Sequence, residues 1–175
     1  MSFRRQPPPC ALPMSCIADF DVVRELGEGG FGRVWLVKEK ANGELYAMKV
    51  QEKKRLVRKR SVARAISEKD CLARLANPFI IKLVYAFQTK AKLCLVLEYV
   101  GGGTLGELQD MMPGKFLDEG AVRFAVSELI VALEYIHGIG IIYRDMKPEN
   151  IREFLGHRAR PQSQGQFATP VTRLW

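Results

Sequence analysis

Cysteine is scarce in this sequence, and its pattern offers no metal site. The 175 residues contain four cysteines, Cys10, Cys16, Cys71 and Cys94, and no two of them form a Cys-x-x-Cys pair. Cys71 and Cys94 lie inside apolar runs, as reduced core cysteines do. The pattern therefore excludes a zinc site and indicates a reducing compartment.

Long apolar runs are also missing. No 18 consecutive residues are apolar, so we predict no segment that spans a membrane. The chain begins Met-Ser rather than Met-Gly, which excludes N-myristoylation, and its first residues lack the apolar centre of a signal peptide. These absences predict a cytoplasmic protein, with the nucleus as the alternative.

Acidic residues are outnumbered, but only in parts of the chain. There are 27 Lys and Arg against 19 Asp and Glu, a net charge of +8. Residues 50–64 contribute +6 and residues 152–175 contribute +3, whereas segments 20–49 and 65–151 together sum to −2. Because the globular body is nearly neutral, we predict no specific nucleic-acid binding. The basic run at 53–60 is predicted to be a solvated face, with a nuclear-import patch and a contact with acidic lipids as alternatives.

Apolar residues make up 47% of the chain, which is enough for a real core. Prolines and arginines near the start predict a flexible leader over residues 1–19. Residues 20–50 predict three consecutive antiparallel strands joined by tight turns, and residues 52–76 switch to helical character. Segments 80–87 and 92–98 predict two further strands.

The second half predicts helices followed by a segment without periodicity. A short helix is expected over residues 104–111, and Asp118 is predicted to cap a longer one. The longer helix carries an apolar stripe of Val122, Ala125, Val126, Leu129, Leu133 and Ile136. After Ile151 the apolar residues are scattered, which predicts a disordered tail over 152–175.

A glycine-rich motif stands between the first two predicted strands. In GEGGFGRV, Gly27, Gly29 and Gly32 would let the backbone approach phosphates closely. A Rossmann turn has the same glycine spacing but must open a helix, whereas Arg33 and the residues after it continue as a strand. The motif favours a hairpin lid over a nucleotide, with a merely tight hairpin as the alternative.

A lysine in the third predicted strand needs a partner. Lys49 lies in an apolar strand, where an unpaired ammonium group is costly. The natural partner is Glu68 on the following helix, since Asp70 points about 200° away from it around the helix axis. The competing interpretation is a surface lysine whose charged end reaches solvent.

The segment YRDMKPEN at residues 143–150 has the spacing of a phosphoryl-transfer loop. Asp145 would orient or accept a hydroxyl proton, and Lys147 would neutralise the moving phosphoryl group. Asn150 would be a ligand of Mg²⁺.

Taken together, these motifs resemble those of the eukaryotic protein kinases over residues 20–151. Phe31, the segment 77–87 and Tyr143 are similar to the AGC group of serine/threonine kinases, and within it to the ribosomal protein kinases and their relatives. The resemblance implies an α+β fold. Residues 20–98 would form the N-lobe, with a five-stranded antiparallel sheet and the helix that the family calls αC. Residues 99–151 would form the hinge and an incomplete helical C-lobe.

The resemblance also implies ATP and Mg²⁺ as cofactors and a role for each motif residue. The predicted catalytic residues are Lys49, Glu68, Asp145, Lys147 and Asn150, of which Asn150 is also the predicted metal ligand. The predicted nucleotide contacts are Leu26, Gly27, Gly29, Gly32, Val34, Ala47, Lys49, Leu97, Glu98 and Val100.

Three departures from the family pattern bear on activity. Thr104 stands where AGC kinases usually carry an acid that meets the ribose and a substrate arginine. Arg152 stands where a leucine normally lies under adenine. No aspartate follows Asp145, and Glu153 is the only acid after Asn150, so the Asp-Phe-Gly segment that holds the principal Mg²⁺ is missing.

The sequence therefore predicts a serine/threonine kinase family member that is truncated after its catalytic loop and is inactive alone. Weak ATP binding is expected, and the expected partners are a protein substrate or a kinase regulator. The alternatives are a non-catalytic N-lobe module that competes for kinase regulators and an unstable splice product.

Overall fold

The structure is a computed structural model that describes residues 12–29, 32–112, 114, 119–154 and 171–174. The chain divides into two compact units, each of which is described by itself. Unit 1 comprises the chain up to Leu75 together with residues 82–99, and unit 2 comprises residues 76–81 and the chain from Val100 onward.

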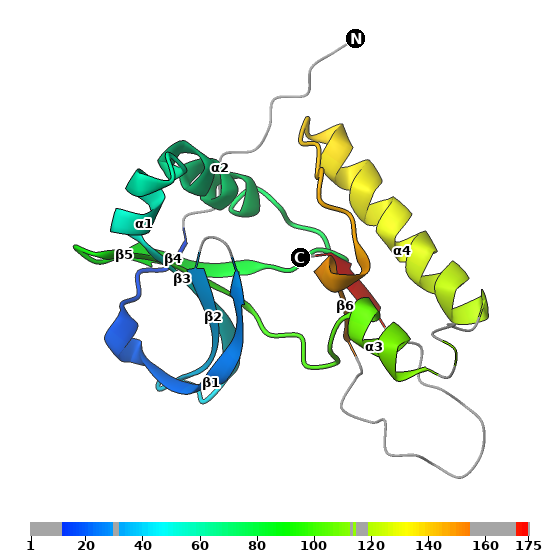
Figure 1. Cartoon of the computed structure of the whole chain (residues 1–175), viewed down its shortest axis with the longest axis horizontal. Coiled ribbons are helices and arrows are strands. Elements are labelled where there is room, and N and C mark those ends of the chain that lie inside the picture. The colour runs from blue at the N-terminus through cyan, green and yellow to red at the C-terminus, as the bar shows by residue number, and fades with distance from the viewer. Residues whose placement is uncertain (1–11, 30–31, 113, 115–118, 155–170, 175) are drawn as a thin grey trace. The chain divides into compact units, whose positions relative to one another are not determined.

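Unit 1 is built on a five-stranded antiparallel sheet, as predicted (Figure 1). Its spatial order is β1-β2-β3-β5-β4, with antiparallel pairing throughout. The strands are β1 (Phe20–Gly29), β2 (Gly32–Glu39), β3 (Leu45–Glu52), β4 (Leu83–Gln88) and β5 (Lys92–Glu98). Tight connections join β1, β2 and β3, and Gly43 adopts a positive φ of 76° in the turn after β2.

Side chains alternate between the two faces of this sheet, as the period of a strand requires. On β3, Tyr46 and Met48 are buried in a core cluster on one face, with Cys94 and Val96 of β5. Phe20 joins the cluster and packs edge-on against Tyr46. The opposite face carries the alternate residues of β3.

Two helices follow β3, in the segment for which the sequence predicted helical character. They are α1 (Lys53–Arg58) and α2 (Val62–Leu72), and both lie on the same side of the sheet in Figure 1. The break falls at Arg60, whose φ is 51°, a left-handed conformation that ends α1. Ser61 occupies the N-cap position of α2, but its side chain makes no capping hydrogen bond.

The predicted leader is shorter than residues 1–19. Ile17–Asp19 form the short helix η1. The carboxylate of Asp19 accepts hydrogen bonds from the backbone nitrogen of Cys16 (2.7 Å) and the hydroxyl of Ser15 (3.0 Å), while Lys40 binds the carbonyl oxygens of Ala18 and Asp19. These bonds attach the end of the segment to unit 1; residues 1–11 lie outside the described part of the chain.

Unit 2 contains helices and a small two-stranded sheet. Its elements are α3 (Leu105–Met111), α4 (Glu119–Gly138), η3 (Pro148–Asn150), β6 (Ile151–Phe154) and β7 (Val171–Leu174). Thr104 caps α3: its hydroxyl accepts from the backbone of Glu107, whose carboxylate accepts from the backbone of Thr104. The predicted cap of the longer helix, Asp118, lies outside the described residues. In the described ranges, no helix is long and apolar enough to cross a membrane.

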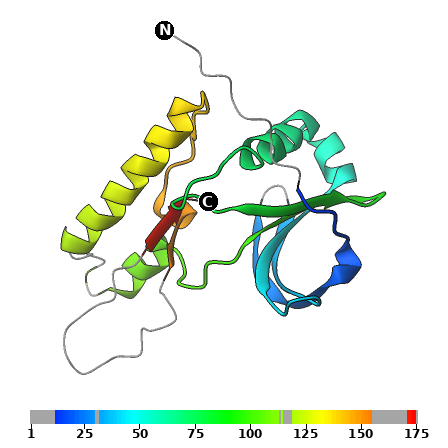
Figure 2. The ribbon, with the colours of Figure 1, turned by 180° about the vertical axis from the view of Figure 1, so that it is seen from behind.

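The prediction of a disordered tail over 152–175 is wrong at both ends of that segment. β7 pairs antiparallel with β6, and Figure 2 shows it, in red, beside that strand. The Leu174 side chain is 1% exposed, and its backbone nitrogen and oxygen bond to Phe79 (2.9 Å) and Ile81 (3.0 Å). The pairing joins residues that are far apart in the sequence, so local periodicity could not predict it. Residues 155–170 lie outside the described part.

The apolar stripe that the sequence predicted for the longer helix lies on α4 and is buried only in part. Ala125, Leu129 and Ile136 are buried, and α4 packs against β7. Val122 and Val126 remain exposed, at 38% and 45%. The apolar face is thus covered on the side that meets β7 and open on the other.

Candidate functional site

The register of unit 1 gathers several predicted nucleotide contacts on one face of the sheet. Lys49 lies directly opposite Val34 of β2 and Leu95 of β5. Ala47, two residues earlier on β3, therefore shares the face of Lys49 and pairs with Leu97. Ala47 and Leu97 are both 3% exposed, so this part of the face is an apolar wall.

Lys49 is paired as the sequence predicted. Its ammonium group lies 2.5 Å from Oε1 of Glu68 on α2, and the two side chains are 18% and 32% exposed. Asp70, the competing acid, instead contacts the neighbouring Lys69 at 2.7 Å. The ion pair with α2 thus fixes the position of the Lys49 side chain. This side chain lies on the sheet face that also carries Val34 and Ala47.

The glycine-rich segment shows two different requirements for glycine. A Cβ atom on Gly32 would lie 2.2 Å from the carbonyl oxygen of Val50, so this position needs a glycine for the start of β2 to lie this close to the end of β3. A Cβ atom on Gly27 would meet nothing within 4 Å, so this glycine leaves open space. Gly29 pairs with Gly32 at the end of the hairpin, and the half-buried Leu26 lies at a bulge of β1. The tip of the hairpin lies outside the described residues.

The predicted hinge spans the boundary between the two units. Glu98 belongs to unit 1, where its backbone nitrogen donates to the carbonyl oxygen of Lys82 (3.0 Å). Val100 belongs to unit 2 and is 2% exposed. Tyr99, between them, accepts a hydrogen bond on its hydroxyl from Arg24 at 3.4 Å.

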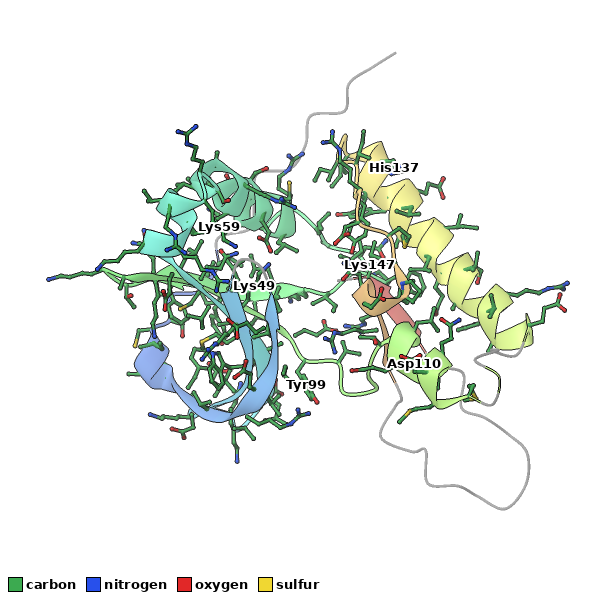
Figure 3. All side chains as sticks on the ribbon, in the orientation of Figure 1. Lys49, Lys59, Tyr99, Asp110, His137 and Lys147 are labelled. Carbon is green, nitrogen blue, oxygen red and sulfur yellow. The ribbon has the colours of Figure 1, made fainter. Side chains whose placement is uncertain are left out.

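In unit 2, the predicted catalytic loop brings its three polar residues together. The side-chain nitrogen of Asn150 donates to the Asp145 carboxylate (2.7 Å) and to the carbonyl oxygen of Asp145 (2.8 Å). The ammonium group of Lys147 lies 3.7 Å from the other carboxylate oxygen of Asp145. Figure 3 labels Lys147 in this loop and Lys49 in unit 1. Asp145 is exposed, so its free edge can accept a proton from a hydroxyl group.

Two residues before Asp145 shape the loop. Arg144 adopts a positive φ of 65°, a conformation that is uncommon for a residue other than glycine. Burial, together with the nearby negative charge of Asp145, raises the pKa of Tyr143 to about 12. Tyr143 therefore stays protonated throughout the physiological range.

Thr104 and Arg152, the two substitutions that depart from the family pattern, are neighbours in unit 2. They form an isolated antiparallel bridge, which joins the start of α3 to β6. Thr104 is 8% exposed and serves as the cap of α3. Its hydroxyl group accepts a hydrogen bond at the start of α3. The acidic residue that AGC kinases usually carry at this position would instead offer a negative charge.

The polar residues of the chain fit a nucleotide better than they fit its metal ion. Open space at Gly27 and the fixed ammonium group of Lys49 suit a phosphate group. Asn150 is the one predicted metal ligand, and the described ranges hold no group of three His, Cys, Asp or Glu suited to a metal ion. No aspartate follows Asp145 in the sequence. The ligand set for Mg²⁺ is therefore incomplete in this chain.

Sequence reasoning missed one charged cluster. Glu28, between the first two glycines, contacts Arg33 of β2 at 3.5 Å and Arg55 of α1 at 3.6 Å. Opposite charges at 28 and 33, across the predicted hairpin, were a signal for the first contact. Nothing in the sequence pattern pointed to the second.

Comparison with known proteins identifies the family. The protein kinase domain family matches residues 20–153. Serine/threonine-protein kinase nrc-2 of Neurospora crassa is 45% identical over 132 residues, which are 75% of this chain and 21% of that protein. The RAC family serine/threonine-protein kinase homolog of Dictyostelium discoideum is 42% identical over 135 residues, 77% of this chain and 30% of that protein.

A plant relative belongs, by its name, to the AGC group of kinases. Serine/threonine-protein kinase AGC1-7 of Arabidopsis thaliana is 42% identical over 135 residues, 77% of this chain and 24% of that protein. The chain thus spans less than a third of the length of each of these three relatives. It belongs to the protein kinase family, and its relatives include serine/threonine kinases of the AGC group.

Proposed function

We propose that this 175-residue chain binds ATP weakly and does not transfer its phosphate. The proposal rests on one contrast. The residues that hold a nucleotide in this family have their counterparts here, whereas the aspartate that holds the principal metal ion has none.

Nucleotide binding is supported by the arrangement within unit 1. Val34 and Ala47 would pack on the adenine ring, and the backbone at Glu98 would hydrogen-bond its edge. The family resemblance alone adds the backbone at Val100, which belongs to unit 2. Lys49, held by Glu68 at 2.5 Å, would contact the phosphates. By the family resemblance, Arg152 stands in place of the apolar residue that normally lies under adenine, and a charge there lowers the expected affinity.

Loss of transfer is supported by the incomplete metal site. In kinases, carboxylate and amide side chains would hold Mg²⁺, and the ion would supply neutralisation of the negative charge that develops during phosphate transfer. Asp145 can still orient a hydroxyl group, and Lys147 can still offer a positive charge. Neither side chain can supply the missing carboxylate ligand of the metal ion. The hydroxyl group would therefore be oriented, but the charge of the transition state would lack the electrostatic stabilisation that the reaction needs.

A titration of the whole chain with ATP, with and without Mg²⁺, tests the binding half of the proposal. Weak binding that Lys49→Met abolishes and that Mg²⁺ strengthens little is the expected result. Lys69→Met is the matched control, since Lys69 pairs with Asp70 on the same helix as Glu68. Tight binding that requires Mg²⁺ would contradict the incomplete metal site.

A second candidate is a binding module that occupies kinase regulators. It is favoured by three exposed apolar side chains on the two helices of unit 1: Val57 (66%), Val62 (41%) and Ile66 (54%). Exposed apolar side chains that gather in one region are typical of protein interaction sites. If this role is correct, Ile66→Asp will abolish capture of an AGC-kinase regulator while Val122→Asp, on the exposed side of α4, will not.

A further inference from the structure

The carboxylate of Glu28 links the glycine-rich segment to α1. Its Oε2 atom lies 3.5 Å from Nε of Arg33, and its Oε1 atom lies 3.6 Å from Nη1 of Arg55. Both oxygens are thus engaged by guanidinium groups, one from the same hairpin and one from the helix. Glu28 is 48% exposed and Arg55 is 34% exposed, so the contact lies at the surface of unit 1.

The course of the chain explains why these residues meet. The beginning of β2 pairs with the end of β3, where Arg33 lies opposite Val50 and Gly32 leaves room for the Val50 carbonyl group. α1 begins at Lys53, directly after β3. The turn end of the glycine-rich hairpin, where Glu28 pairs with Arg33, and the first turn of α1 are therefore neighbours, and an arginine in that turn reaches across to Glu28.

We propose that Arg55 is a positioning residue for nucleotide binding, because it holds the glycine-rich hairpin to α1 through Glu28. The inference rests on the proposed nucleotide site. An uncompensated carboxylate between the first two glycines would repel a triphosphate, and the two guanidinium groups neutralise it. The position of the phosphate-binding backbone then depends on α1, so anything that moves α1 also changes affinity for the phosphates.

The basic run itself supplies a matched control. Arg58 lies one turn beyond Arg55 on α1 and is exposed, and none of the ion pairs among the described residues involves it. Arg55→Gln and Arg58→Gln remove the same charge from the same helix. Only the first breaks the contact with Glu28, so a difference between the two variants reports the contact rather than the net charge.

Hydrogen exchange of the whole chain without nucleotide is the first measurement. Arg55→Gln should speed exchange of the backbone amides at Gly27 and Glu28 about two- to fivefold, the range expected for a partly exposed ion pair. Arg58→Gln should leave them unchanged, and Arg55→Lys should restore part of the protection. Equal rates in Arg55→Gln and Arg58→Gln would overturn the proposal, whatever the chain binds.

Affinity for ATP and for adenosine is the second measurement. Arg55→Gln should weaken the binding of ATP about two- to fivefold and leave the binding of adenosine unchanged, because Glu28 lies between the two glycines that are predicted to approach the phosphates. Adding Arg55→Gln to Glu28→Gln should produce less than the sum of the two effects. Equal weakening of ATP and adenosine would show a general loss of structure and refute the positioning role. If the unaltered chain binds no ATP, the proposed function fails, and the exchange result still decides whether Arg55 holds the hairpin.

Discussion

Replacing Leu174 by alanine should destabilise unit 2 by about 2–5 kcal/mol, the cost of truncating a buried leucine. The side chain is 1% exposed, and it belongs to the strand that packs on α4. Its backbone bonds to Phe79 and Ile81 survive the substitution, so the loss comes from apolar packing. Because a domain is stable by only about 5–15 kcal/mol, the change removes a large share of that margin.

Hydrogen exchange at Ala132 and Ile136 of α4 is the assay that isolates unit 2. These residues are 0% and 1% exposed, so their amides report opening of the face that β7 covers. Val122→Ala is the control, since Val122 on the same helix is 38% exposed and its truncation should cost only about 0.5 kcal/mol. If the two variants lower protection of α4 equally, β7 does not cover the helix and the account of unit 2 is wrong.

Three further predictions concern unit 1. Gly32→Ala should destabilise the sheet by about 1–3 kcal/mol, because the added methyl group meets a backbone carbonyl, while Gly27→Ala should not; chemical denaturation measures both. A hydrogen bond to a carboxylate raises the pKa of Tyr85 to about 12, so the stability that it contributes is complete below pH 10 and is lost as the pH rises towards 12. An absorbance titration of the Tyr85→Phe variant should show one tyrosine fewer ionising near pH 12, where Tyr143 still titrates. Glu68→Gln should weaken ATP binding while Asp70→Asn leaves it unchanged, and equal effects in calorimetry would contradict the assigned ion pair.

Local sequence patterns were enough to predict those strands, helices and contacts that depend on residues close together in the chain or on regular helix geometry. The pattern of residues 20–50 predicted the three antiparallel strands β1, β2 and β3, and helix geometry favoured Glu68 over Asp70 as the partner of Lys49. The spacing of Asp145, Lys147 and Asn150 likewise predicted a loop whose polar groups meet.

What the sequence could not predict depends on contacts between distant segments. Leu174 becomes a core residue only because β6 and the backbone at 79–81 accept it, and neither partner is visible in its own neighbourhood. The assignment of residues 76–81 to unit 2 follows from the same pairing. Arg55 reaches Glu28 because the beginning of β2 pairs with the end of β3, directly before α1. The charges within any one segment do not reveal this pairing.

Transfer of labelled γ-phosphate from ATP to a generic basic protein tests the central claim most directly. The purified chain should transfer no more label than its Asp145→Asn variant, because orientation of a hydroxyl group without the second metal ligand cannot complete the reaction. Label incorporated by the unaltered chain and lost in Asp145→Asn would show that this chain is an active kinase and would contradict the account.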